Sequence, residues 1–157
     1  MTEVVLNNEM SISYPEGFHV MDKEELKGQQ FLQEGPGWCI SDPDRHIVVS
    51  AAWRKTNGLI ARMLNTRDVA KNMSAQIRKP MQKFGFQLEG FLQKEMGGLR
   101  ADGYLYQYEV QGTGMAGESF CIKKGSTFYY IHCYFRKALK EESLAVLEEI
   151  FQSVAWK

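Results

Sequence analysis

The stretch STFYYIHCYFRK, residues 126–137, decides the fold that the sequence predicts. Almost every side chain in it is large, and aromatic and β-branched residues are enriched in strands. A strand that is bulky on both faces is typical of the centre of a sheet, where both faces are covered. We therefore expect residues 126–137 to form a central strand.

The same stretch contains an adjacent histidine and cysteine, His132 and Cys133. A catalytic thiolate needs its base within hydrogen-bonding reach. Successive side chains of a strand, however, point to opposite faces of the sheet. If residues 126–137 form a strand, these two side chains cannot make a catalytic dyad.

The rest of the chain supplies further strands and a smaller number of helices. Strand patterns cover residues 10–14, 86–95, 99–110 and 118–124, together with a hairpin over residues 35–53 whose turn is DPDR, residues 42–45. A helix with a three-to-four-residue apolar period is predicted from Asn65, its N-cap, toward Pro80, which should end or kink it near Lys79. Other helical patterns span residues 22–28, with Asp22 and Glu25 as a reciprocal cap, residues 58–64, and the C-terminal residues 140–156.

This pattern predicts an α+β protein in which an antiparallel sheet of about six to seven strands is flanked by helices on both faces, an α/β/α sandwich. With 157 residues the chain fits one domain, residues 1–157. A helix-grip fold is the main structural alternative, since it also lays a long C-terminal helix across an antiparallel sheet. An interior cavity of several hundred cubic ångströms would favour that alternative.

Composition excludes several classes of protein. No apolar run reaches 18 residues, so no membrane span is expected. The N-terminal residues lack the features of a signal peptide, and a cytoplasmic location is expected. The three cysteines are widely spaced and are interpreted as buried free thiols rather than disulfides or zinc ligands. We expect no metal and no cofactor.

The glycines of residues 112–117, GTGMAG, have the spacing of a dinucleotide-binding motif but not its structural context. In that motif the glycines follow a strand and open a helix that holds the pyrophosphate. Here the next segment is strand-like, so residues 112–117 are interpreted as a flexible hairpin loop. No other motif assigns a catalytic residue, and we do not expect an enzyme.

Formal charges cancel over the chain but are unevenly distributed. The net charge is −6 over residues 1–53, +7 over residues 54–94 and −1 over the remainder. The basic middle segment either faces the acidic N-terminal third of its own chain or docks on an acidic partner protein. The candidate partner-binding residues are Arg54, Arg62, Arg67, Lys71, Arg78 and Lys79. A neutral chain makes nucleic acid an unsuitable partner.

Strand register suggests a second candidate site. A two-residue turn at Lys124–Gly125 and a five-residue loop at residues 112–116 would collect the most apolar side chains on one face. The other face would then place polar groups among aromatic rings, as small-molecule pockets do. These ligand-binding candidates are Glu109, Ser119, Tyr130, His132 and Tyr134. The alternative is that a helix covers this face.

Several segments together resemble the PsbP-like superfamily. They are SISYPEGF (residues 11–18), GYLYQYEV (residues 103–110), the strand at residues 126–137 and LEEIFQSVAW (residues 147–156). This superfamily includes a photosystem extrinsic protein and a Ran-binding nuclear import factor. The resemblance implies an antiparallel sheet with helices on both sides and a role in binding or assembly without catalysis. It carries over no functional residue. We therefore expect a non-catalytic module that binds a partner protein, the alternative being a small-ligand binder or enzyme that uses the polar aromatic face.

Overall fold

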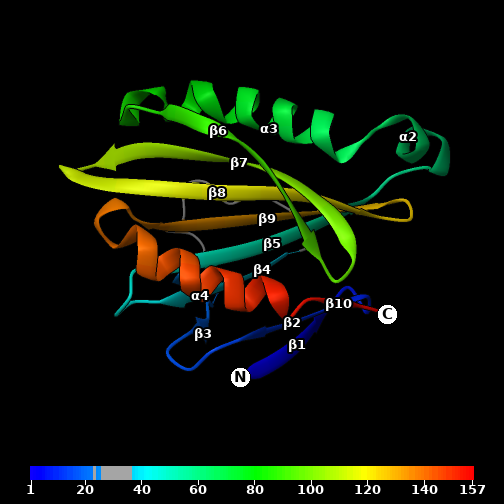
Figure 1. The fold of residues 1–157 in the computed structure, drawn as a ribbon, viewed down its shortest axis with the longest axis horizontal. Coiled ribbons are helices and arrows are strands. Elements are labelled where there is room, and N and C mark those ends of the chain that lie inside the picture. Colours follow the sequence, from blue (N-terminus) through cyan, green and yellow to red (C-terminus); the bar gives the residue numbers. More distant parts are fainter. Residues whose placement is uncertain (23, 26–36) are drawn as a thin grey trace.

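The computed structural model describes residues 1–22, 24–25 and 37–157, whose strands form two antiparallel sheets. The larger sheet has seven strands in the order β3-β4-β5-β9-β8-β7-β6 (Figure 1). Their bounds are β3 His19–Val20, β4 Gly37–Asp42, β5 Ile47–Lys55, β6 Gln87–Met96, β7 Leu99–Val110, β8 Thr113–Lys124 and β9 Thr127–Arg136. The predicted α+β class is confirmed, and the strand predicted at residues 126–137 is β9, between β5 and β8. The smaller sheet joins β1 (Thr2–Leu6), β2 (Met10–Tyr14) and β10 (Ala155–Trp156) in the order β1-β2-β10.

Helices cover both faces of the larger sheet, as predicted. Helix α3 (Thr66–Met81) lies over β7 and β8, whereas α4 (Lys140–Gln152) and the smaller sheet lie on the opposite side (Figure 1). Each face has its own cluster of buried side chains, with Met73 and Met81 of α3 in one and Leu147 and Phe151 of α4 in the other. The short helix α2 (Gly58–Met63) precedes α3. None of the helices in the described residues is long and apolar enough to cross a bilayer.

Local sequence signals explain the limits of α3. The Asn65 side chain accepts a hydrogen bond from the Asp68 backbone N–H at 2.9 Å and donates one to the Asp68 carboxylate at 3.0 Å, so the predicted N-cap is confirmed. Pro80 lies in the last turn, and the helix ends at Met81, just beyond the expected position. A single turn of 3₁₀-helix, Gln82–Phe84, then closes on Gly85 at a φ of +73°, which favours glycine.

The pairing of β8 with β9 separates the histidine from the adjacent cysteine. Lys124 pairs with Thr127, so the turn is Gly125–Ser126, one residue beyond the predicted turn. The pairing therefore differs from the predicted one by two residues, which leaves the faces unchanged. His132 lies on the α3 face opposite Ser119, while Cys133 belongs to the core on the α4 side. The exclusion of a His–Cys dyad follows from this geometry.

The predicted register of β7 with β8 is wrong. The turn has two residues, Gln111–Gly112, and residues 113–117, predicted as part of a loop, begin β8. Glycines opposite aromatic rings explain this register. A Cβ on Gly117 would lie 2.2 Å from the ring of Tyr106, its cross-strand partner. A Cβ on Gly103 would likewise lie 2.6 Å from the ring of Phe120. The rings occupy the space that a side chain would need.

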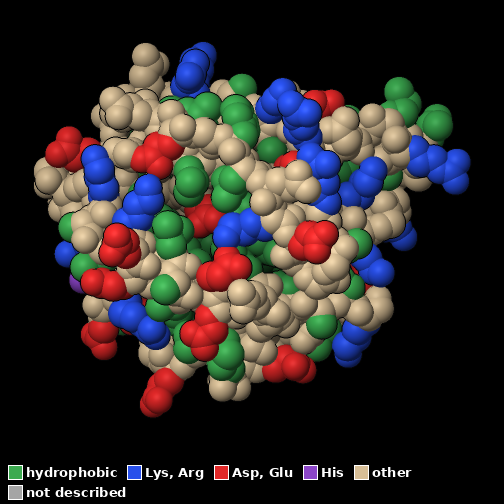
Figure 2. All heavy atoms as spheres, in the orientation of Figure 1, with side chains coloured by type: hydrophobic (Ala, Val, Ile, Leu, Met, Phe, Trp, Pro, Cys, Tyr) green, Lys and Arg blue, Asp and Glu red, His purple; other side chains and the backbone are tan. Residues whose placement is uncertain are grey.

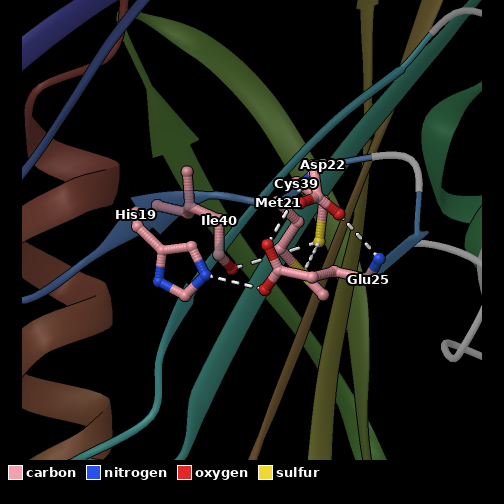
Figure 3. Close-up of polar contacts among 6 residues, drawn as sticks. All are labelled: His19, Met21, Asp22, Glu25, Cys39 and Ile40. Carbon is pink, nitrogen blue, oxygen red and sulfur yellow. Dashed lines mark hydrogen bonds and ion pairs between the residues drawn. The ribbon is translucent and has the colours of Figure 1, made fainter.

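Polar contacts close the corner where β3 meets β4 (Figure 3). The Glu25 backbone N–H donates to the Asp22 carboxylate at 2.8 Å, and the Asp22 backbone N–H donates to the Glu25 carboxylate at 3.3 Å. The predicted reciprocal cap is therefore present, and Glu25 also contacts His19 at 2.8 Å. At the same corner, the Cys39 thiol lies 3.1 Å from the Met21 sulfur. The rest of the helix predicted at residues 22–28, and the first residues of the predicted hairpin, lie outside the described residues.

Candidate functional site

The polar aromatic face is a buried layer of the larger sheet, on the side where α3 packs against β7 and β8. One cross-strand row runs from Ser50 through His132 and Ser119 to Tyr104. The Ser119 hydroxyl and His132 Nδ1 are 2.8 Å apart. All four side chains in this row are buried. Helix α3 covers the part of this face that β7 and β8 form, which agrees there with the hypothesis that a helix covers the face.

The corrected register removes Glu109 from this face. It pairs with Gly114, and its exposed side chain points to the opposite side of the sheet from His132. The tyrosines at positions 104, 106 and 108, predicted for the core face, take its place beneath α3. Of the five ligand-binding candidates, the structure brings together Ser119, His132, Tyr130 and Tyr134 and separates only the carboxylate. The proposed carboxylate–imidazole pair does not form.

Burial governs the ionisation of this layer. It lowers the pKa of His132 to about 4, so the imidazole is neutral at physiological pH. Burial also raises the pKa of Tyr104 to about 12, although a hydrogen bond with Ser119 acts in the opposite direction. His132 Nε2 has no hydrogen-bond partner among the described residues. A neutral, fully buried imidazole is suited to packing rather than to acid–base chemistry.

The six basic candidates are all exposed. In the described part of the chain none of them forms an ion pair, and no ion pair joins the basic middle segment to the acidic N-terminal third. The hypothesis of internal neutralisation is therefore not supported. Four of the candidates lie on α3, while Arg54 is the penultimate residue of β5 and Arg62 lies on α2.

A cleft lies between the first turns of α3 and the β6–β7 hairpin, where α3 does not reach across the sheet. It consists of two adjoining hollows of about 540 Å³ each, which share the side chains of Arg67, Lys71 and Arg100. Phe91, half exposed on the edge strand β6, lines one of them. We call this region the basic cleft. It brings two of the predicted partner-binding residues together with Arg100, which the sequence analysis did not single out.

One buried carboxylate organises the floor of the basic cleft. Asp102 accepts hydrogen bonds from Thr66 Oγ1 at 2.5 Å and from Arg100 Nε at 2.7 Å. Burial alone would raise the pKa of Asp102, but the hydrogen bonds of Arg100 and Thr66 and the charges of Arg100 and Arg67 lower it. This network fixes the Arg100 guanidinium beside the N-terminus of α3. Arg67 and Lys71 have no such acidic partner among the described residues.

Sequence reasoning also missed Glu118, which lies on the α4 side of β8. Its carboxyl is almost fully buried, and Oε2 has no hydrogen-bond partner among the described residues. Desolvation raises its pKa to about 7. Such a carboxyl is unusual, but it faces the packed core beneath α4 rather than a cleft. Within the described residues no group of three or more His, Cys, Asp or Glu side chains is placed to hold a metal ion.

Solved structures of three bacterial proteins share this arrangement. Cyanobacterial PsbP from Synechocystis is 10% identical, with a TM-score of 0.66 over 94% of this chain and 86% of that protein. The chain has a PsbP-like fold. LpqN of Mycobacterium tuberculosis, described as involved in cell envelope biogenesis, is 13% identical, with a TM-score of 0.58 over 94% of this chain and 83% of LpqN.

The third structural neighbour is a protein from Bacteroides thetaiotaomicron. It is 12% identical with a TM-score of 0.58, and the similarity covers 94% of this chain but only 45% of that protein, so this chain spans about half its length. No family model matches the sequence, and no curated protein matches it either. At 10–13% identity these likenesses show the fold alone.

Proposed function

We propose that this chain is a non-catalytic binding module that docks an acidic segment of a partner protein in the basic cleft. The observation that carries the proposal is the pairing of two exposed cations, Arg67 and Lys71, with a solvent-open hollow that also presents Phe91. Carboxylates of a partner would neutralise the cations, and an apolar side chain would pack on the ring.

The edge of the sheet adds to the attraction of this site. Strand β6 is the last strand of the larger sheet, and in the described part of the chain it pairs only with β7. Main-chain groups at such an edge can receive an extended segment of a partner. Asp68 and Asp102 also line the basic cleft and reduce its positive charge. A segment with a few carboxylates therefore suits it better than a densely charged polyphosphate chain.

The ionisation of the thiols supports a role without catalysis. Burial, and a smaller effect of Glu25, raise the pKa of Cys39 to about 12. Burial also raises the pKa of Cys121 to about 12, and it raises the pKa of Cys133 well above its ordinary value. A thiol is nucleophilic only as the thiolate. None of the three cysteines is therefore suited to act as a nucleophile near neutral pH.

Affinity capture from the native cell tests this function. The bait is the full chain, compared with a cleft variant, Arg67→Glu/Lys71→Glu, and with a matched variant, Arg78→Glu/Lys79→Glu, that makes the same charge change at the other end of α3. We expect the unmodified bait and the matched variant to retain a common partner that the cleft variant loses. Retention should weaken as salt rises above about 0.1 M, where the screening length is ~10 Å.

Two results would contradict the proposal. One is a partner that the cleft variant retains and the matched variant loses, because binding would then use the C-terminal end of α3. The other is retention that does not change with salt, because the cations would then contribute nothing to association. Circular dichroism spectra should be the same for all three baits, since all four substituted side chains are exposed.

A further inference from the structure

Helix α2 exposes an apolar surface that the fold does not use. Of its six residues only Ala61 is buried. The exposed fractions are 70% for Leu59, 44% for Ile60, 75% for Met63 and 38% for Leu64, which follows the helix. We call these four side chains the apolar knob. Single exposed aliphatic side chains are common, but four within six residues mark an interaction site.

Polar contacts hold α2 in place from beneath. Asn57 caps its first turn by accepting a hydrogen bond from the Ile60 backbone N–H at 2.8 Å. Lys123 Nζ donates to the carbonyl oxygens of Ala61 and Leu64, both at 2.9 Å. The helix is therefore anchored to the β8–β9 hairpin through its C-terminal carbonyls. The outward direction of the apolar knob is a fixed feature of the fold.

The surroundings of the apolar knob carry charge of one sign. Residues 54–66 and 121–128 contain basic side chains and no acidic one. The two segments adjoin, since the Thr56 backbone N–H donates to the Ser126 carbonyl at 2.8 Å. We call these basic residues the basic ring: Arg54, Arg62 and Lys123, on the α2 side of the sheet, and Lys55 and Lys124, whose strand positions face the other side. Helix α2 lies at one end of the long axis (Figure 1), and Figure 2 shows hydrophobic and basic side chains together at that end.

The shape and charge of this end select the partner. A stable protein interface buries roughly 800 Å² on each side, which is far more than one protruding helical turn offers. A second copy of the chain would bring two basic rings together across a twofold axis. An anionic lipid surface avoids both difficulties, because aliphatic side chains enter the acyl boundary while basic side chains pair with the headgroups.

We propose that the apolar knob and the basic ring dock the protein on an anionic lipid surface. The apolar knob and the basic ring share no residue with the basic cleft, whose lining begins at Asn65, next to Leu64 in the chain. The lipid headgroup supplies the negative charge, and the acyl boundary receives Leu59 and Met63, the two most exposed members of the apolar knob. The interaction is peripheral and reversible.

Vesicle co-sedimentation of the full chain tests the proposal. Phosphatidylcholine vesicles are compared with vesicles in which about one-third of the lipid is phosphatidylserine, at ionic strengths near and above physiological. The variant Leu59→Ser/Met63→Ser removes the two most exposed side chains of the apolar knob, with Val20→Ser, a change at an exposed apolar residue on β3, as its control. The variant Arg62→Glu alters the basic ring, with Arg78→Glu on α3 as its control.

We expect the unmodified chain to bind the anionic vesicles and to release them as salt rises. The knob variant should lower the partition coefficient more than about tenfold, because two buried aliphatic side chains are lost. Arg62→Glu should lower it at least about fivefold, since one basic residue near the surface contributes roughly that factor. Both controls should bind as the unmodified chain does.

Three outcomes would overturn the proposal. The first is no binding of the unmodified chain to anionic vesicles. The second is equal binding by the unmodified chain and the knob variant. The third is a different occupant of the apolar knob, found without any lipid binding. This would be self-association in sedimentation equilibrium that the knob variant abolishes, or capture of one acidic protein that only the knob variant loses. A negative result in this test would not contradict the function proposed for the basic cleft, because Arg67 and Lys71 are intact in every variant.

Discussion

Glu118 is a carboxyl whose ionisation the fold opposes. It lies against Cys133 on the neighbouring strand, beneath α4, with the Lys94–Glu148 ion pair and Lys140 nearby. Desolvation raises its pKa from 4.5 to about 7, and Glu148 adds to this while the two lysines partly oppose it. A raised carboxyl pKa means that the folded state binds a proton more tightly than the unfolded chain does. Stability therefore falls as pH rises through this window.

We predict that Glu118→Gln makes the protein more stable relative to the unmodified chain as pH increases. The gain should grow from pH 4.5 to about pH 7 and then level off at about 3 kcal/mol, the free-energy equivalent of a pKa that is raised from 4.5 to about 7. Urea unfolding followed by tryptophan fluorescence at several pH values measures it. A constant difference between the two proteins across this range would contradict the burial of an ionisable carboxyl.

His132 sharpens this test because its effect has the opposite sign. Its folded pKa of about 4 lies below its ordinary value of 6.5, so its contribution to stability is present at high pH and is lost as pH falls through that window. The two slopes oppose each other in the unmodified chain between pH 4.5 and 6.5. In Glu118→Gln only the histidine slope remains, and stability should rise clearly with pH. Glu109→Gln, at an exposed position on β7, is the matched control for the loss of one carboxylate.

The strands show which parts of the fold are accessible to pattern reasoning. The bulk of residues 126–137 predicts a central strand, and β9 is one. Grouping the apolar residues on one face predicts a five-residue loop after β7 and puts Glu109 on the face of His132, whereas the two-residue turn of the structure puts it on the other face. The tyrosines explain this error in register. A tyrosine ring packs in an apolar core while its hydroxyl is polar, so a pattern of polar and apolar residues does not show which face it occupies. Glycines opposite aromatic rings carry the missing signal.

We predict that Gly117→Ala destabilises the protein by about 2–3 kcal/mol, because a Cβ would lie 2.2 Å from the buried ring of Tyr106 and would force it to move. Gly114→Ala, in the same strand, is the matched control. Its Cβ would meet Lys137 at an ordinary 3.5 Å, so it should be neutral or slightly stabilising. Urea unfolding at one pH compares the two. Equal effects would contradict the observed β7–β8 register.

The sequence patterns do not predict where the basic segment lies on the surface or how the smaller sheet is formed. The basic middle segment predicts either an internal or an external partner, and only the placement of α3 shows that Arg67 and Lys71 remain unpaired in the described residues. The strand β10 has two residues, too few for any periodic signal, yet it pairs with β2 and joins the two ends of the chain. Such contacts depend on long-range packing.

Trp156 of β10 connects the smaller sheet to the larger one. Its indole N–H donates to the Met96 carbonyl at 2.8 Å, and its ring packs edge-on against Tyr129. The same ring covers Gly97, where a Cβ would lie 2.7 Å from it. The β6–β7 turn and the C-terminus are therefore in direct contact, although they are far apart in the sequence.

We predict that this contact makes Gly97→Ala and Trp156→Ala non-additive. Gly97→Ala meets both backbone strain, at a φ of +63°, and the indole ring, and only the second cost disappears when the ring is removed. The loss of unfolding free energy in the double variant should therefore be smaller than the sum of the two single losses by about 1 kcal/mol or more. The remaining cost includes the Val154 carbonyl, 2.9 Å from the added Cβ. Gly98→Ala carries similar strain at a φ of +84° with no atom within 4 Å, so it should be additive with Trp156→Ala. Urea unfolding of both double-mutant cycles measures the coupling, and equal coupling in the two cycles would mean that β10 does not dock on this turn.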